Sequence, residues 1–425
     1  MTGSPDDVVE EFARVAATKD RCFWLDGGGS RQWSGRRSLI GWLDPDDVSL
    51  SYDAARREVT RHAEGRSEVV GDAIFDVLED QMAGDDASVH WVGYFGYACR
   101  PDLPARPADG VPDAVWMRAR NVRFHQHGAT VAEVAETASG VVSTSSTTGD
   151  GSTTVPDWYA EAFLRVQEEL HAGNSYEVNL TYRLAIESGL DPVTAYVRLR
   201  ERNPAPYAGF LRHRGTHLLS SSPERFATID RHRWVETRPM KGTTARGASP
   251  EEDERLRLHL ASDPKFRAEN LMIVDLLRND LSMVCETGTV TVPDLMKVES
   301  YASVHQLVST VRGHLRDDVT TVGALRAMFP AGSMTGAPKL RTMQIIDAVE
   351  TTPRGVYAGA FGWISGDGRA DLGVVIRSLV EHDGQWELGT GGAITVRSDL
   401  TEEYAETRWK STRVIAALDG EDSGH

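Results

Sequence analysis

The sequence predicts a mixed fold of helices and strands, of the α/β type, around a sizeable core. Its 425 residues suffice for two ordinary domains or one large α/β unit, and 40% of them are hydrophobic. From residue 157 onward, segments with the apolar spacing of helices alternate with segments that alternate like strands. A globular, soluble protein is therefore expected.

Charge and cysteine content narrow the class of protein. Lys and Arg total 46 against 63 Asp and Glu, a formal net charge of −17, which disfavours nucleic acid or an anionic membrane as the main partner. The three cysteines, Cys22, Cys99 and Cys285, are isolated and odd in number, as is typical of a reducing compartment. The acidic start of the chain resembles no targeting segment, so we expect a cytoplasmic protein.

Three regions follow from composition. Residues 1–137 contain short apolar runs punctuated by glycine, CFWLDGGG, RRSLIGWL and SVHWVGYFGYACR, which predict strands joined by tight turns. Residues 138–156 are rich in Ser, Thr and Gly and lack apolar periodicity, which predicts a flexible loop. Residues 157–425 carry all the motifs with chemical meaning and form the expected catalytic region.

The catalytic region opens with a helix and a strand. Residues 157–171 place four apolar side chains at helical spacing, Tyr159, Phe163, Val166 and Leu170. The sequence HAGNS then ends the helix, and SYEVNLTYRLAI alternates like a strand.

Two later helices carry carboxylates in unusual places. Asp263 and Pro264 predict the cap and first turn of a helix that extends to about residue 280. That helix is apolar nearly all round, so Glu269 is expected to point inward. A salt bridge from Glu269 to an arginine such as Arg278 is the alternative explanation for this carboxylate.

The last helix is predicted to begin after Ser398 or Asp399. Glu403, Glu406 and Lys410 follow on one of its faces. Acidic residues in a first turn commonly favour the helix dipole alone. Two carboxylates from different helices are, however, also what a Mg²⁺ site needs.

Glycine-rich turns supply potential anion-binding backbone. The segment GSMTGAPKL predicts a turn into a helix with Pro338 at its first position, where Ser333 and Thr335 offer hydroxyls. The segment GTGGAI, residues 389–394, offers further N–H groups after an expected strand.

A single lysine stands out in the segment RPMKGTTARG. Lys241 lies between Pro239, which stiffens the chain, and Gly242, which makes it flexible, and two threonines follow. From this segment alone, a solvated turn lysine and a nucleophile both remain open, and the turn is the commoner case.

Eight motifs give the wider context, because together and in this order they resemble the family of chorismate-utilising enzymes. They are SPERF, PMKGT, AENLMIVDLLRNDL, VHQLVSTV, FPAGSMTGAPK, YAGAFGWI, GGAI and EYAETRWK. The similarity is clear from about residue 157 to 418 and looser upstream. It implies the anthranilate synthase component I fold, in which large antiparallel β-sheets pack as a sandwich with helices outside.

Within the family, Lys241 indicates the aminodeoxychorismate synthase branch, since relatives that make anthranilate carry alanine there. The resemblance implies that Lys241 is the nucleophile and Glu224 the general acid, with Glu269 and Glu406 as Mg²⁺ ligands. It implies substrate contacts from Gly242, Thr243, Tyr357, Arg377, Gly391, Gly392 and Ala393. The residues Glu403, Lys410, Thr335 and Ser333 are expected around these groups.

Three positions depart from the family pattern. Glu177 stands where glutamine is usual and where water-adding relatives have a lysine base, which argues against isochorismate or salicylate synthesis. Phe266 replaces an acid, and Gln306 follows His305 where many relatives have a histidine. These departures bear on proton transfer and on the surroundings of the metal.

The implied reaction converts chorismate and ammonia to 4-amino-4-deoxychorismate, for 4-aminobenzoate and folate synthesis. Attack by Lys241 requires its neutral form, which predicts a pKa lowered by ~2 units or more. No cysteine lies in a nucleophile turn, so ammonia is expected from a separate glutamine amidotransferase subunit. One alternative is another chorismate-aminating enzyme, of the anthranilate or 2-amino-2-deoxyisochorismate type or one that supplies 4-aminobenzoate to an antibiotic pathway. The other is a non-catalytic chorismate-binding homologue.

The resemblance also bears on feedback control. Relatives that make anthranilate sense tryptophan between N-terminal strands and a Pro-Tyr segment. This chain retains Pro206 and Tyr207, but Asp26 and Gly27 stand where a Glu-Ser pair is common, which predicts no inhibition by tryptophan.

Overall fold

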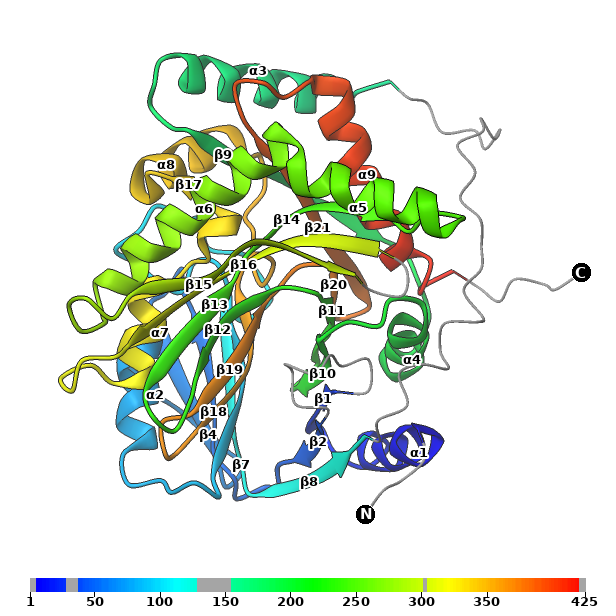
Figure 1. Ribbon diagram of the computed structural model, residues 1–425. Coiled ribbons are helices and arrows are strands. Elements are labelled where there is room, and N and C mark those ends of the chain that lie inside the picture. Colours follow the sequence, from blue (N-terminus) through cyan, green and yellow to red (C-terminus); the bar gives the residue numbers. More distant parts are fainter. Residues whose placement is uncertain (1–4, 28–36, 128–153, 301–303, 420–425) are drawn as a thin grey trace, which may run out of the picture.

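Two antiparallel β-sheets face each other and helices cover their outer surfaces (Figure 1). A computed structural model describes residues 5–27, 37–127, 154–300 and 304–419. This architecture confirms the expected sandwich with helices outside. The predicted loop at residues 138–156 falls, up to residue 153, outside the described residues.

The first sheet contains nine strands among the described residues. Their order is β17 (Gly336–Ala337), β9 (Glu177–Ile186), β21 (Gln385–Ile394), β20 (Ser378–His382), β11 (Thr216–Ser222), β10 (Tyr207–His213), β1 (Arg21–Asp26), β2 (Arg37–Trp42) and β8 (Asn121–Gln126).

The second sheet contains twelve strands in the described part of the chain. Their order is β14 (Met240–Ala245), β16 (Val304–His314), β13 (Trp234–Arg238), β12 (Arg225–Ile229), β19 (Ala370–Val374), β18 (Ala360–Ser365), β6 (His90–Phe95), β7 (Ala114–Ala119), β3 (Ser49–Asp53), β4 (Glu58–Ala63) and β5 (Arg66–Gly71), with β15 (Thr291–Ser300) paired to β16.

N-terminal strands are built into both sheets. Strand β1 pairs with β10 in the first sheet, and β6 pairs with β18 in the second. The predicted N-terminal strand segments coincide with β1, β2 and β6. Every pairing between these strands is antiparallel, and successive side chains of a strand point to opposite faces of its sheet.

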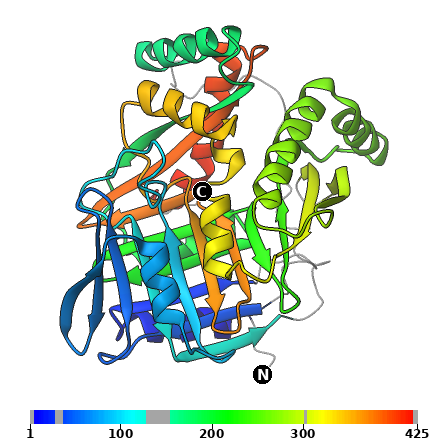
Figure 2. The ribbon, with the colours of Figure 1, turned by 90° about the vertical axis from the view of Figure 1, so that its left-hand side faces the viewer.

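The helices lie outside the sheets. They are α1 (Pro5–Ala16), α2 (Ile74–Met82), α3 (Asp157–His171), α4 (Pro192–Arg202), α5 (Pro250–Ser262), α6 (Pro264–Ser282), α7 (Thr321–Met328), α8 (Lys339–Val349) and α9 (Leu400–Ile415), with a 3-10 turn at Gly332–Met334. Figure 2 shows α2 and α7 side by side over the second sheet, and α5 and α6 beside the strands β14 to β16.

Helix α3 confirms the predicted helix in both its bounds and its buried face. Helix α6 confirms the predicted start, since the Asp263 carboxylate accepts hydrogen bonds from the N–H groups of Lys265 and Phe266. The expectation that α6 is buried because it is apolar nearly all round is wrong, since Leu271 and Arg278 lie on an exposed face. Strand β9 begins two residues later than the predicted strand.

The core between the sheets is apolar. Side chains of both sheets meet there, among them Phe23, Val92, Leu218 and Phe361. The three cysteines are free and buried. Among the described residues, no helix combines the length and the apolar character needed to cross a membrane.

Candidate active site

A cavity of about 450 Å³ opens where β14, β21, α6 and α9 come together. Almost all the site residues expected from the sequence line it. They are Lys241, Glu224, Glu269, Glu406, Gly242, Thr243, Tyr357, Arg377, Gly391, Gly392, Ala393, Glu403, Lys410 and Ser333. Segments distant in the sequence, from Asn179 to Ser411, thus line one cavity.

A β-bulge presents Lys241 to the cavity. In the pairing of β14 with β16, Met240 lies opposite Val308 and Thr243 opposite Gln306, so β14 has one extra residue. Gly242 takes up that residue with φ 87°, a left-handed conformation that favours glycine. A Cβ atom at this position would also lie 2.9 Å from the ring of Phe266. Glycine is therefore required beside the lysine for steric reasons.

Lys241 is not a solvated turn residue. Its side chain is 11% exposed, and its Nζ atom donates a hydrogen bond to Oε1 of Glu177 at 2.7 Å. Burial opposes the charge on Lys241, but the carboxylates of Glu177, Glu269 and Glu224 outweigh it and raise the lysine pKa above its ordinary value. The lowered pKa required by the sequence argument depends on burial and on a bound cation; burial acts in that direction, and the three carboxylates act against it.

Glu224 is a carboxyl group suited to donate a proton. It lies between β11 and β12, is 7% exposed, and its backbone carbonyl accepts a hydrogen bond from the N–H of Val374 at 3.0 Å. Burial raises the pKa of Glu224 to about 6, although a hydrogen bond from Ser333 and the charge of Lys241 act in the opposite direction. An acid form of Glu224 is thus available close to neutral pH.

Glu269 faces inward, as expected. The alternative partner Arg278 pairs instead with Asp275 at 3.2 Å, so the proposed salt bridge is absent. Burial raises the pKa of Glu269 to about 7, with Lys241 opposing the shift and Glu177 adding to it. Its Oε1 atom is buried and has no hydrogen-bond partner in the described part of the chain. An unsatisfied buried carboxylate oxygen is well suited to a cation.

Helix α9 brings the other carboxylates. Asp399 caps the helix, and Glu406, whose side chain is half exposed, pairs with Lys410 at 2.8 Å. Glu403 is buried and accepts hydrogen bonds from Ser398 at 2.7 Å and Lys265 at 3.4 Å. Within the described residues, no three acidic, histidine or cysteine side chains form a metal cluster by themselves. Mg²⁺ does not require one, because it retains waters and binds substrate oxygens.

The glycines of GTGGAI lie inside strand β21 rather than after it, which corrects the predicted boundary. Gly391 pairs with Thr181 of β9, and its carbonyl accepts a hydrogen bond from Lys410 at 3.1 Å. At Gly389 a Cβ atom would lie 2.1 Å from the ring of Tyr357. Small residues in this strand therefore leave room for the tyrosine that lines the cavity.

The turn before α8 differs from its prediction in two ways. Pro338 is the N-cap, and the helix begins one residue later at Lys339. The hydroxyl of Thr335 donates to the carbonyls of Ala331 and Gly332. The expectation that Thr335 lies at the cavity is therefore wrong. Ser333 alone of the two hydroxyl residues faces the cavity.

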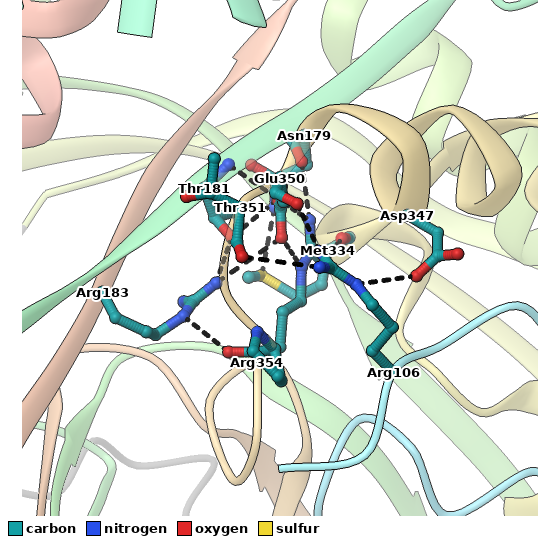
Figure 3. Close-up of polar contacts among 10 residues, drawn as sticks. Arg106, Asn179, Thr181, Arg183, Met334, Asp347, Glu350, Thr351 and Arg354 are labelled. Carbon is teal, nitrogen blue, oxygen red and sulfur yellow. Dashed lines mark hydrogen bonds and ion pairs between the residues drawn. The ribbon is translucent and has the colours of Figure 1, made fainter. Parts of the chain in front are cut away.

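A buried ion pair holds this turn in place (Figure 3). The Arg354 guanidinium donates to both oxygens of Glu350, and also to the carbonyls of Met334 at 2.6 Å and Asn179 at 2.8 Å. Glu350 in turn accepts hydrogen bonds from the N–H and hydroxyl of Thr181, each at 2.8 Å. The pair thus joins β9, α8 and the turn that carries Ser333.

The N-terminal region also contacts the ion pair of Glu350 and Arg354. Arg106 donates to the carbonyls of Glu350 and Thr351 and pairs with Asp347 at 3.1 Å. The Arg354 guanidinium lies 4.5 Å from the ring centroid of Tyr97. A region without catalytic motifs therefore stabilises the wall of the cavity.

The cavity residues that were not predicted from the sequence include Lys265 and Asn179. Lys265 lies one helical turn before Glu269, so the spacing could have indicated it. Asn179 lies in β9, where Glu177, Asn179 and Thr181 are all buried. Polar residues at every second position of a buried strand were the available signal.

Of the three departures from the family pattern, Gln306 and Phe266 line the cavity, whereas Glu177 is buried and does not. His305 points the other way along β16, where Asp253 at 2.9 Å and Ser300 at 2.8 Å satisfy both ring nitrogens. The neighbouring histidine therefore does not reach the cavity in place of Gln306.

A second cavity, of about 290 Å³, contains the residues considered for tryptophan binding. Asp26, Gly27, Pro206 and Tyr207 line it. The Asp26 carboxylate pairs with Arg200 at 2.6 Å.

We expect millimolar tryptophan to leave the rate of the ammonia-dependent reaction unchanged. Glycine at position 27 lacks a side-chain hydrogen bond, which costs about 1 to 3 kcal/mol, or roughly five- to a hundred-fold in affinity. Rates measured with and without tryptophan test this, and a clear fall in rate would contradict it.

Comparison with known proteins identifies the family. The model of the chorismate binding enzyme family matches residues 20–416. "Aminodeoxychorismate synthase" of Streptomyces griseus is 40% identical, and that of Streptomyces pristinaespiralis 38%, each over 97% of this chain. This chain spans only 63% and 64% of the length of these relatives.

A solved structure agrees in fold. Anthranilate synthase component I from Streptococcus pneumoniae TIGR4 superimposes with a TM-score of 0.73 at 25% identity, covering 89% of this chain and 92% of that one. The chain therefore belongs to the chorismate binding enzyme family.

Proposed function

We propose that the protein is component I of an aminodeoxychorismate synthase and converts chorismate and ammonia to 4-amino-4-deoxychorismate. The observation that carries this proposal is a lysine, Lys241, held by a bulge in the same cavity as a protonatable carboxyl group, Glu224. The names of the two Streptomyces relatives support the same reaction. Mixed charges in the cavity suit a substrate with two carboxylates.

The reaction begins with loss of the substrate 4-hydroxyl. Glu224 in its acid form donates a proton to the departing oxygen, while the neutral amine of Lys241 attacks ring carbon 2. Water leaves and a lysine-linked intermediate results. Ammonia then adds at carbon 4, the bond between carbon 2 and the lysine nitrogen breaks, and the lysine takes the electron pair.

Positive groups hold the substrate against the acidic surroundings. Arg377 and Lys410 line the cavity and lower the pKa of Glu224 less than burial raises it, so they provide positive charge while this pKa stays above its ordinary value. An arginine fork can pair with a carboxylate through two parallel hydrogen bonds. Glu269 and Glu406 would hold Mg²⁺, which when bound supplies positive charge for a substrate carboxylate.

Ammonia is proposed to come from a glutamine amidotransferase partner. With ammonium salt in solution the reaction should proceed without it. The test is to incubate the purified protein with chorismate, Mg²⁺ and ammonium salt and to identify the product by mass spectrometry and chromatography. Anthranilate or isochorismate as the main product would contradict the proposal, as would chorismate binding without turnover.

We expect Glu269→Gln and Glu406→Gln each to raise the Mg²⁺ concentration for half-maximal activity by about tenfold or more. Each change removes one charged ligand from a site with few protein ligands. Titration of activity and of the Mg²⁺-induced rise in Tm are independent measures of this. Glu402→Gln, at an exposed carboxylate in the first turn of α9, is the matched control. If both site variants titrate like the parent, the metal binds elsewhere.

A further inference from the structure

Behind Lys241 lies a carboxylate that no step of the proposed reaction uses. Glu177 is 0% exposed and does not line the cavity. Its Oε1 atom accepts the hydrogen bond from Lys241 Nζ at 2.7 Å, and its Oε2 atom is buried without a partner among the described residues. Among the described residues, the side chain of Glu177 thus makes a hydrogen bond to Lys241 alone.

The lysine needs a proton acceptor before it can attack carbon. Its ammonium form has no lone pair, and the surrounding carboxylates favour that form, as described above. A proton acceptor must lie within hydrogen-bond reach, about 2.6 to 3.2 Å. Glu177 meets this condition. Its position behind the amine also leaves the front of the nitrogen directed to the cavity.

We propose that Glu177 accepts a proton from Lys241 as the lysine-linked intermediate forms, and returns it when the lysine leaves. This inference rests on the proposed function. Burial penalises both the ammonium and the carboxylate, and transfer of the proton within the pair removes both charges. Transfer within the buried pair leaves its net charge unchanged.

The protons and electrons balance over the cycle. Proton transfer gives a neutral Lys241 amine and a protonated Glu177. The amine nitrogen then bonds to carbon 2 while the bond from carbon 4 to its hydroxyl oxygen breaks. This hydroxyl takes the proton of Glu224 and leaves as water. Ammonia bonds to carbon 4, and the lysine departs as a neutral amine that regains its proton from Glu177. The ammonium group on carbon 4 then reprotonates Glu224.

The test measures the covalent intermediate directly. Full-length protein is mixed with chorismate and Mg²⁺ without ammonia, and intact-protein mass follows an adduct equal to chorismate minus one water. Glu177→Gln keeps the shape and a hydrogen-bond acceptor but removes the base. We expect adduct formation to slow by about 100-fold or more with chorismate affinity unchanged, and Glu177→Asp to restore part of the rate.

A matched control is available in the same protein. Asp280 and Lys339 form another buried carboxylate and lysine pair, 2.8 Å apart and outside the cavity lining. Asp280→Asn should lower Tm but form the adduct at the parental rate. This variant separates the general cost of breaking a buried ion pair from the loss of a proton acceptor.

The outcomes discriminate between the roles of Glu177. A carboxylate that only holds the lysine in its charged form would slow the reaction, so its removal would leave adduct formation unchanged or faster. That result in Glu177→Gln, with a normal adduct in the parent, overturns this inference alone. Absence of any adduct in the parent overturns the lysine-linked mechanism and this inference with it.

Discussion

Lys241→Ala should lose ammonia-dependent formation of aminodeoxychorismate by on the order of 1000-fold or more, because it removes the atom that bonds to the substrate. The cavity and its other charged groups remain in this variant. Ammonia can then reach carbon 2 in place of the lysine nitrogen and give 2-amino-2-deoxyisochorismate, from which loss of pyruvate yields a small amount of anthranilate. Product analysis under saturating chorismate and ammonium salt measures both changes.

Lys241→Arg is the control for the charge. It retains a cation beside Glu177 without a nucleophilic amine, so it should keep Tm closer to the parent than alanine does, yet remain inactive. Turnover of either variant at the parental rate would remove Lys241 from the mechanism.

The sequence predicted the main features of this site because they are local. The caps at Asp263 of α6 and Asp399 of α9 and the inward position of Glu269 each follow from the residue spacing within a single helix. Ordered motifs then placed the distant segments in one family. Errors at Pro338 and in β21 were shifts in element boundaries, which depend on tertiary pairing more than on local propensity.

The remaining features depend on contacts between distant segments. Lys241 and Glu177 are separated by 64 positions, and Arg354 reaches Asn179 across 175. No local pattern specifies such pairs, and the polar residues at alternate positions of β9 are known to need partners only once the structure shows that they are buried. The carboxylates of Glu177, Glu269 and Glu224, which raise the pKa of Lys241 against the effect of burial, also come from segments distant in the sequence.

Glu224→Gln should reduce kcat/KM by about 100- to 10,000-fold, because an amide cannot donate the proton that the leaving hydroxyl needs. The parent should also lose activity as the pH rises through the pKa of Glu224, about 6, since only the acid form donates. Above that pKa the acid fraction falls tenfold per pH unit. A profile of kcat/KM over roughly pH 5 to 9 measures this fall in activity, the alkaline limb of the profile. Glu224→Gln should lack the alkaline limb.

Asp113→Asn is the matched control for this prediction. Burial also raises the pKa of Asp113 to about 6, but Asp113 lies outside the cavity lining, where its carboxylate accepts a hydrogen bond from the N–H of Ala54 at 2.9 Å. Its amide variant should change Tm and keep the alkaline limb. An unchanged limb in Glu224→Gln, or its disappearance in Asp113→Asn, would assign the proton donor to another group.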